Sequence, residues 1–405
     1  MFDVTLKQPS RIEAPRIAYW GSLGEAWRLA LRMTLLTLAT LGAYRFWVKA
    51  TVRRYFWSRI TVNDEPLEYA GTGLELFIGF LIVLAIVTPF YGIVIVGQLL
   101  LTGDPFWFAA SQIAPAFFIL ALIPIAVFRA RRYRLSRTLW RGIRAGQTGT
   151  ASGYWLRAIG YGTLGWLTLG LLRPLAQVRL TRYLMQNTWF GTTRFAFKAR
   201  ARQLMWRWLV FWVTLIFAYS ASMLAIYLLE ENAQELAGTD SNAPFPIKLA
   251  DLWNAKPERI VFNGGLLALI WALSGGTYVW YRINQARIFV GATTLGDLNF
   301  ASRIRFWRVA RIYAIAAVAY VVLVIGASVL SFSLFGPQFG ILGVIVVGLL
   351  AGALFMPFVT HPLVGHFVET LSVDGALDVD DLVQNTEIAP KNGEGLASVF
   401  EVDAM

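Results

Sequence analysis

Residues 182–197 read RYLMQNTWFGTTRFAF, and this stretch decides the fold because its spacing returns at four other places in the chain. A basic residue is followed six residues later by Thr, then by Gly after three more and by an aromatic residue after another four. The copies are Arg182/Thr188/Gly191/Phe195, Arg287/Thr293/Gly296/Phe300, Arg54/Ile60/Asn63/Leu67, His366/Ser372/Gly375/Val379 and the weakest one, Arg132/Thr138/Arg141/Ala145. A spacing that recurs in this way indicates one structural unit copied along the chain.

Each copy predicts a helix end followed by a short β-hairpin. The Thr or β-branched residue begins a strand, and alternating apolar residues, such as Phe195 and Phe197, continue after the turn. Gly and Asn tolerate the positive φ that tight hairpin turns need. The predicted turn positions are Asn63, Gly191, Gly296 and Gly375. Several such hairpins at one membrane face can pair into a sheet.

Long uncharged runs lie between the copies. The chain is 57% hydrophobic and 15% charged, whereas soluble domains carry about 25% charged residues. The runs are Leu76–Gly103, Pro105–Phe128, Trp208–Leu229, Ile260–Tyr281 and Ile312–Thr360. A membrane-spanning helix needs about 20 apolar residues, so the last run has room for two, with a turn at residues 335–340 (FGPQFG). The sequence therefore predicts six full transmembrane helices.

Most basic residues fall into stretches that are almost free of acidic residues. These stretches are residues 45–59, 129–144, 173–207 and 282–311. Lys and Arg are enriched in cytoplasmic loops of membrane proteins, so we expect all four stretches, and both termini, in the cytoplasm. The loop after Leu229 is acidic and suits the outer side.

Two further uncharged segments are too short to cross. Residues 33–44 and 158–172 reach about 18 and 22 Å as helices, short of a hydrocarbon core of about 30 Å. If they crossed, neighbouring basic stretches would face opposite compartments. We interpret both as re-entrant or interfacial helices; tilted spans with snorkelling arginines are the alternative.

The predicted fold class is an all-α polytopic membrane protein with six full spans, two short re-entrant or interfacial helices and small cytoplasmic β-hairpins. The order of segments indicates a duplication in one orientation, a pattern known from transporters. The predicted parts are a cytoplasmic N-terminal segment (1–18), a first repeat half (19–144), a second repeat half (145–311), an added two-span hairpin with the last motif copy (312–383) and an acidic, disordered tail (384–405).

Three strings carry a resemblance to a known family. They are TLGAYRFW at residues 40–47, RRYFW at 53–57 and GTGLELF at 71–77. With them the chain resembles the YjgN family of bacterial inner-membrane proteins from about residue 19 to 383, although Asn63 stands where a glycine is usual. The resemblance implies a location in the bacterial cytoplasmic membrane and implies no catalytic residue, since the family has no established activity.

A lead-in string also repeats, as YWGSLGE at residues 19–25 and YAGTGLE at 69–75. It lacks the Lys-Ser/Thr of a phosphate-binding loop and the strand–helix context of a dinucleotide fold. We therefore interpret it as a turn that caps a membrane helix.

The polar side chains predicted inside the membrane are the first candidate site. Gln98 and Gln112 lie within two consecutive apolar runs, and Pro89 and Pro124 interrupt the same pair. Polar groups in hydrocarbon are costly and frequently functional. They can line a substrate path, or they can form an interhelical hydrogen bond that stabilises the bundle.

The repeated arginines are the second candidate. Arg54, Arg132, Arg182 and Arg287 occupy one slot of the motif, and we expect them to contact lipid phosphates or another anion. Arginines interleaved with aromatic residues also suit nucleic acid, but six spans favour anionic lipid, so no nucleic-acid partner is predicted.

The composition restricts the kinds of metal, cofactor and catalytic site that the chain can be expected to have. The chain has no Cys and two His, which argues against a metal site or cofactor, and no predicted span carries a carboxylate. We therefore predict no enzymatic activity. The function expected is transport or handling of a small or lipid-like substrate. The alternative is a non-catalytic scaffold or accessory subunit that binds a partner protein at its cytoplasmic face.

Overall fold

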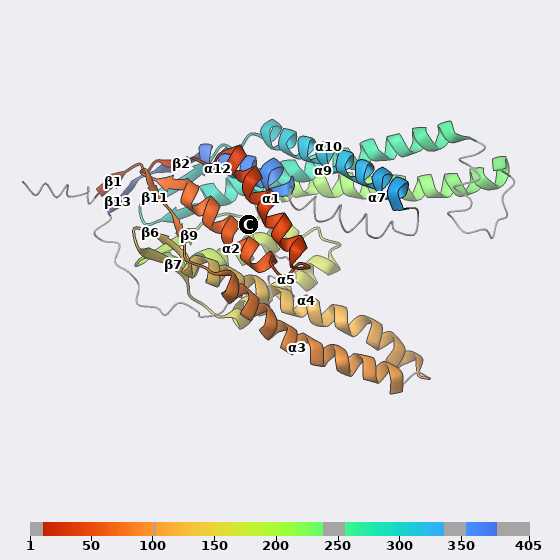
Figure 1. The fold of residues 1–405 in the computed structure, drawn as a ribbon, viewed down its shortest axis with the longest axis horizontal. Coiled ribbons are helices and arrows are strands. Elements are labelled where there is room, and N and C mark those ends of the chain that lie inside the picture. Colours follow the sequence, from red (N-terminus) through yellow and green to blue (C-terminus); the bar gives the residue numbers. More distant parts are fainter. Residues whose placement is uncertain (1–10, 101–102, 238–255, 336–353, 379–405) are drawn as a thin grey trace, which may run out of the picture.

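The structure is a computed structural model that describes residues 11–100, 103–237, 256–335 and 354–378. It is mostly helical, with long helices extending from one side of a β-sheet region (Figure 1). The helices are α1 (Leu23–Ala39), α2 (Arg45–Arg59), α3 (Gly73–Leu100), α4 (Pro105–Ser136), α5 (Ala151–Leu167), α6 (Arg173–Gln186), α7 (Arg202–Ala237), α9 (Pro257–Gly291), α10 (Phe306–Phe335), the π-helix η2 (Met356–Thr360) and α12 (His361–Glu369). The strands are β1 (Arg11–Glu13), β2 (Ile17–Tyr19), β3 (Ile60–Val62), β4 (Glu65–Pro66), β5 (Glu68–Tyr69), β6 (Thr138–Trp140), β7 (Ile143–Gln147), β8 (Thr188–Phe190), β9 (Thr193–Phe197), β10 (Thr293–Leu295), β11 (Leu298–Ser302), β12 (Leu371–Asp374) and β13 (Ala376–Asp378).

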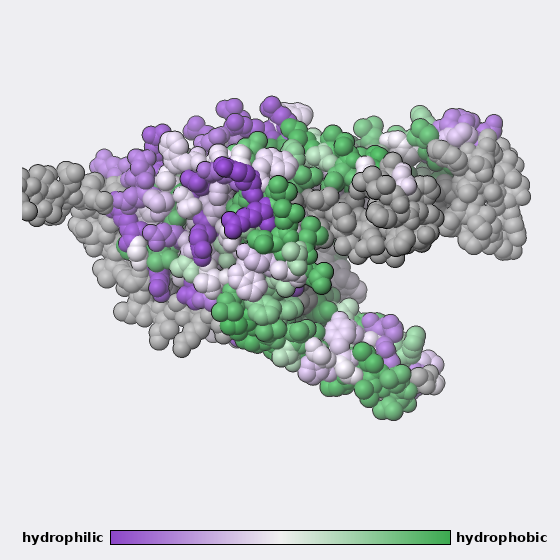
Figure 2. Space-filling model, viewed as in Figure 1, coloured by the Kyte–Doolittle hydropathy of each residue, from purple (hydrophilic) through white to green (hydrophobic). Residues whose placement is uncertain are grey.

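Five helices in the described part are long and apolar enough to cross a membrane. They are α3, α4, α7, α9 and α10, and they coincide with the first five predicted spans. Their side chains are mostly exposed and apolar, as hydrocarbon requires; Figure 2 shows the hydrophobic surface along these helices and the hydrophilic surface at the sheet end. The predicted turn at residues 335–340 and most of the sixth span lie outside the described residues.

The sheet region is built from the motif copies. An eight-stranded sheet has the order β12-β11-β10-β9-β8-β7-β6-β5, and a three-stranded sheet has the order β2-β3-β4. The pairs are antiparallel, as in Trp189 opposite Arg194 across the β8–β9 turn. The second and third motif copies therefore pair directly in one sheet, through β7 and β8.

The turn residues of the motif adopt positive φ. The angle is 51° at Asn63, 56° at Gly191, 55° at Gly296 and 114° at Gly375. In the weakest copy a non-glycine residue, Arg141, takes φ 52°, a conformation that costs an L-residue about 1–2 kcal/mol.

Every helical segment leaves the sheet region and returns to it. The chain runs β2–α1–α2–β3, then β5–α3–α4–β6, β7–α5–α6–β8, β9–α7–α9–β10, and finally β11–α10 to α12–β12. We call each such out-and-back pair a helical hairpin, and its end at the sheet the base. The α1–α2 and α5–α6 hairpins are the short ones, and the other three contain the candidate spans.

The two short uncharged segments are not single helices. Residues 33–44 form the end of α1 and a turn, and residues 158–172 form most of α5 and a matching turn. In each case a basic helix, α2 or α6, brings the chain back. The sequence prediction measured only the uncharged part, so it missed the returning helix.

The main core lies where helices meet strands. One cluster contains Val178 of α6, Phe197 of β9, Leu204 and Trp208 of α7 and Tyr281 of α9, all fully or nearly buried. This position, at the base rather than along the helices, leaves the distal helix surfaces to lipid.

Candidate functional site

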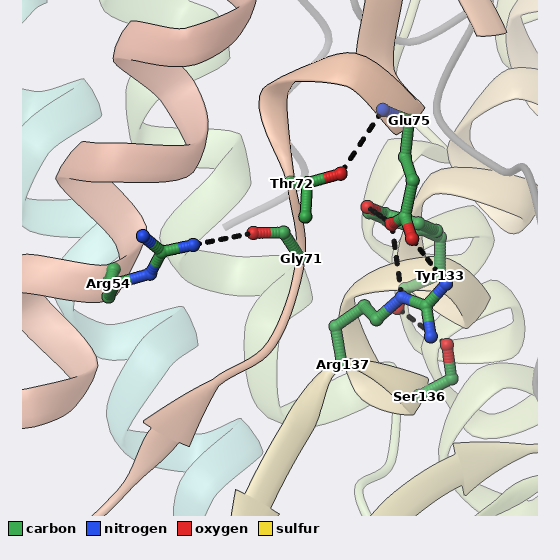
Figure 3. A network of polar contacts seen from close by, with 7 residues as sticks. All are labelled: Arg54, Gly71, Thr72, Glu75, Tyr133, Ser136 and Arg137. Atoms are coloured by element: carbon green, nitrogen blue, oxygen red, sulfur yellow. Dashed lines mark hydrogen bonds and ion pairs between the residues drawn. The ribbon is translucent and has the colours of Figure 1, made fainter. Parts of the chain in front are cut away.

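The base of the α3–α4 hairpin holds a partly buried polar network (Figure 3). Thr72 caps α3 by accepting a hydrogen bond from the backbone N–H of Glu75 at 3.3 Å. The Glu75 carboxylate then accepts from Arg137 Nε at 3.2 Å and Nη2 at 2.8 Å. The hydroxyl of the fully buried Tyr133 donates to the same carboxylate.

The Glu75 carboxylate is fully engaged by Arg137 and Tyr133, which does not suit a general base. Arg137 neutralises Glu75 in a two-point contact, the strongest geometry for a carboxylate pair. The first turn of α3 also favours a negative charge. The arrangement therefore joins the start of α3 to the end of α4, and it presents neither a free base nor an activated nucleophile.

Ion pairs also join the outgoing and returning helices at two other bases. In the α1–α2 hairpin, Glu25 of the first helical turn pairs with Arg59 of the last at 2.9 Å, and Ser22 is the cap. At the last base the charges are exchanged, since Arg308 of α10 pairs with Glu369 of α12 at 2.8 Å. An ion pair between the start of the outgoing helix and the end of the returning helix is thus present at the α1–α2, α3–α4 and α10–α12 bases.

Three motif arginines make one recurring backbone contact. Arg54, Arg182 and Arg287 each donate to the carbonyl oxygen of the residue 17 positions later. These acceptors are Gly71, at 3.3 Å from Arg54 (Figure 3), Ala199, at 2.7 Å from Arg182, and Ile304. Each acceptor lies between the second strand of a hairpin and the next helix. The arginine therefore links one helix, the following β-hairpin and the start of the next helix; we call this contact the arginine clasp.

The clasp gives these arginines a contact within the chain that the sequence did not predict, and their contacts with lipid phosphates or other anions stay a prediction. The sequence predicted contacts with lipid phosphates or anions, whereas at least one guanidinium nitrogen of each of the three is engaged within the chain. In the fifth copy the residue in this slot is His366, whose Nε2 accepts a hydrogen bond from the backbone N–H of Arg305 at 3.0 Å. Arg132 lies on α4, and a lipid contact there stays a prediction.

The predicted intramembrane polar residues are not gathered into one site. Gln98 of α3 donates to Ser111 of α4 at 3.0 Å, which is the interhelical hydrogen bond given as the alternative. Gln112 is exposed on the helix surface. Pro89 lies inside α3 and Pro124 inside α4, and both helices continue through them. A substrate path along these four residues stays a prediction.

The tips of the two short hairpins are alike. Both carry Thr-Leu-Gly, at residues 40–42 and 168–170. Leu41 and Leu169 have φ of 50° and 51° and expose 98% and 79% of their surface. Both tips therefore place a largely exposed leucine in a strained, left-handed backbone conformation. An exposed apolar side chain at the same place in both hairpins indicates an apolar environment around the tips.

The chain matches a known protein family over most of its length. Residues 14–399 match the family described as bacterial protein of unknown function DUF898. The chain belongs to this family. It is also similar to the inner membrane protein YjgN of Salmonella typhimurium, with 37% identity over 70 residues. That match covers 17% of this chain and 18% of the relative's length. No solved structure matches.

The resemblance to the YjgN family is confirmed, and this DUF898 chain is a multi-pass protein of the bacterial inner membrane. Among the described residues no group of three or more His, Cys, Asp or Glu side chains is placed to hold a metal ion. The family description assigns no function, so any activity has to be argued from the chain's own residues.

Sequence reasoning missed the ion pairs at the bases. A local pattern was present, because Tyr55 and Tyr133 each stand four residues before the paired arginine, Arg59 or Arg137. The Ser22 and Thr72 caps, each with Glu three residues later, were a second signal for the helix starts. The partners themselves are up to 62 residues apart, and only the fold brings them together.

Proposed function

We propose that this protein handles lipids or lipid-like molecules at the cytoplasmic leaflet of the inner membrane, without enzymatic chemistry. In the proposed topology six spans cross the bilayer, the sheet region and both termini lie in the cytoplasm, and the α1–α2 and α5–α6 hairpins enter only one leaflet. The observation that carries the proposal is the pair of exposed leucine tips, Leu41 and Leu169, each on a hairpin that returns to the sheet.

The depth of these tips supports insertion into one leaflet. Trp212 and Trp208 of α7 donate to the carbonyl oxygens of Leu169 and Gly170, both at 2.9 Å. Trp208 begins the uncharged run of α7 and Trp212 lies one turn further. The tip is therefore level with the first turns of the apolar region.

Basic residues accompany both tips. Arg45 and Arg173 follow the tip leucines by four residues in each hairpin. Arg45 lies over the ring of Phe80 of α3 at 5.3 Å, and Arg173 lies over Trp208 of α7 at 5.4 Å. An apolar tip followed by cations suits the boundary between acyl chains and anionic headgroups.

The experiment is lipid retention by the purified full-length chain. Native mass spectrometry after extraction in a delipidating detergent is expected to find anionic lipids bound, and fewer of them in a Leu41→Ser, Leu169→Ser double variant. Gln112→Ser, which changes one exposed side chain on α4, is the matched control and should retain wild-type lipid. Equal retention by the double variant and the wild type would refute lipid handling at the tips.

A scaffold is the second candidate, and the Gln98–Ser111 hydrogen bond favours it. A polar side chain that is hydrogen-bonded to the neighbouring helix stabilises the packing of the two helices, and this structural role does not require a substrate. If the chain retained no lipid but co-purified stoichiometrically with one inner-membrane complex, and a reconstituted complex reproduced the binding, the scaffold would replace lipid handling.

A further inference from the structure

Arg131, near the end of α4, carries a charge with no carboxylate partner in the described part of the chain. Its Nη2 donates to Thr188 Oγ1 at 3.3 Å and to Met185 Sδ at 3.5 Å, two weak neutral acceptors. Its Nε is buried and has no hydrogen-bond partner among the described residues. A buried guanidinium is destabilising unless a counter-charge or strong acceptors compensate it.

Gln147 of β7 is the second unsatisfied group at this place. Its side chain is nearly completely buried, with 2% exposed, and neither Oε1 nor Nε2 has a partner in the described region. Gln147 lies directly opposite Thr188 in the β7–β8 pair, so the two side chains share a face at a Cβ separation of about 5 Å. Thr188, whose hydroxyl Arg131 contacts, therefore stands between the guanidinium and the amide.

Aromatic rings close the surroundings. Phe128, Tyr154 and Tyr183 pack with ring centroids 5.8–6.3 Å apart. Phe128 lies one helical turn before Arg131 on α4, and Phe128 and Tyr154 are both buried. Residues 129–144 contain seven arginines and no acidic residue. The local field is thus positive, and it favours an anion over a cation or a neutral ligand.

We propose that Arg131 and Gln147 bind a phosphate-type oxyanion at the β7–β8 junction, where the second and third motif copies pair. The guanidinium Nε–H and the amide Nε2–H are the donors, and Thr188, which contacts Arg131 and lies opposite Gln147, holds Arg131 on the same side of the sheet as the amide. Arg matches oxyanions through its planar fork. The proposal deepens the proposed function, on which it rests only for the source of the phosphate: a lipid headgroup or the free anion.

The test is thermal unfolding of the full-length, delipidated protein in detergent, followed by intrinsic tryptophan fluorescence. Sodium phosphate and dihexanoyl phosphatidylglycerol are titrated separately, with sodium chloride at matched ionic strength as reference. A ligand that binds only the folded state raises the midpoint in a saturable way. We expect a rise of a few degrees with the phosphatidylglycerol, with phosphate, or with both, and none with chloride.

Three variants assign that rise to the site. Arg131→Gln and Gln147→Leu should abolish the saturable rise, while Arg129→Gln, which removes an exposed charge from the same helix end, should keep it. A response to inorganic phosphate identifies the free anion as sufficient, and a response to the phosphatidylglycerol alone identifies a headgroup.

The proposal is overturned if neither phosphate source raises the wild-type midpoint, or if the rise survives in Arg131→Gln. A saturable rise that persists in Gln147→Leu would also overturn it, because the anion would then bind without the amide donor. None of these results affects lipid retention at the tips, so the proposed function can stand when the anion site fails.

Discussion

Arg182 Nη2 donates a 2.7 Å hydrogen bond to the carbonyl oxygen of Ala199, which is buried where the chain leaves β9 for α7. The bond connects the end of α6 to the start of α7 across the β8–β9 hairpin. Because the same contact recurs from Arg54 and Arg287, it is a joint of the repeated unit. It explains why an arginine stands at the same distance before the turn in these three copies.

Arg182→Gln should destabilise the protein because the shortened, neutral side chain leaves the Ala199 carbonyl unsatisfied. Hydrogen bonds from charged donors contribute about 1.5–3 kcal/mol, so the free energy of unfolding should fall by about that amount. Denaturant titration in detergent measures it. Arg194→Gln, at an exposed position of β9, is the control and should change little. Equal losses in both variants would mean that charge, and not the clasp, is responsible.

The turn at Arg141 makes a second prediction. Arg141 at φ 52° pairs with Glu65 of β4, with Nη2 2.9 Å from Oε1. The pair links the first and second motif copies and offsets the left-handed strain, which explains why this copy departs from the Gly pattern. Arg141→Gly should therefore be close to neutral in the wild type and stabilising by about 1 kcal/mol in a Glu65→Gln background.

A double-mutant cycle on thermal unfolding measures this difference. A coupling energy of about 0.5–1 kcal/mol between Arg141 and Glu65 is expected for a partly exposed pair. If Arg141→Gly has the same effect in the wild type and in the Glu65→Gln background, the ion pair does not compensate the turn.

His366 should make the stability of the folded protein depend on pH. Burial, with a smaller contribution from the nearby Arg308, lowers the pKa of His366 below its ordinary value. Its Nε2 must be unprotonated to accept from the Arg305 N–H. The unfolded chain then binds more protons than the folded one, so stability is complete above about pH 6.5 and falls as the pH drops below that value.

The measurement compares the unfolding midpoint at pH 7.5 and 5.5. His366→Gln keeps an acceptor but does not titrate, so its midpoint should fall less across this interval than the wild-type midpoint. Arg305, Arg308 and Glu369 are the charged residues in contact with this part of α12, and both proteins keep them, so the comparison isolates His366. An identical fall in the wild type and the variant would exclude His366 as the cause.

The sequence predicted well what depends on local composition. The candidate spans α3, α4, α7, α9 and α10 follow from uncharged runs longer than about 20 residues. It predicted poorly where a helix is basic, because α2 and α6 carry arginines that interrupt any hydropathy signal. The α1–α2 and α5–α6 hairpins were therefore taken for single short helices.

Contacts between residues far apart in the sequence were the other feature that could not be predicted. The Gln98–Ser111 bond was one of two open alternatives, and the choice depended on how α3 and α4 pack. The carbonyl acceptors of the clasp carry no side-chain signal at all, since Gly71, Ala199 and Ile304 are three unrelated residue types. A backbone partner cannot be recognised from residue identity, only from the regular spacing of its donors.

The depth of the short hairpins is the most direct test of the proposed topology. The chain has no cysteine, so Leu41→Cys and Leu169→Cys each supply a unique site for a nitroxide label in proteoliposomes. Power saturation with oxygen and with a water-soluble nickel chelate then reports depth. Interfacial segments bury their apolar face about 5–10 Å below the headgroup boundary, and we expect both tips in that range.

Two reference positions calibrate these depths and make the prediction of one-leaflet insertion refutable. Ile93→Cys, 73% exposed near the middle of the uncharged run Leu76–Gly103, marks the deep reference, and Arg194→Cys on β9 marks the aqueous one. Tip labels that match Arg194→Cys would place both hairpins in water, and labels that match Ile93→Cys would show that they reach mid-membrane. Because the tips share one tripeptide and one backbone conformation, the two depths should also agree with each other. A shallow value at Leu41 with a deep value at Leu169 would mean that only one short hairpin acts at the cytoplasmic leaflet.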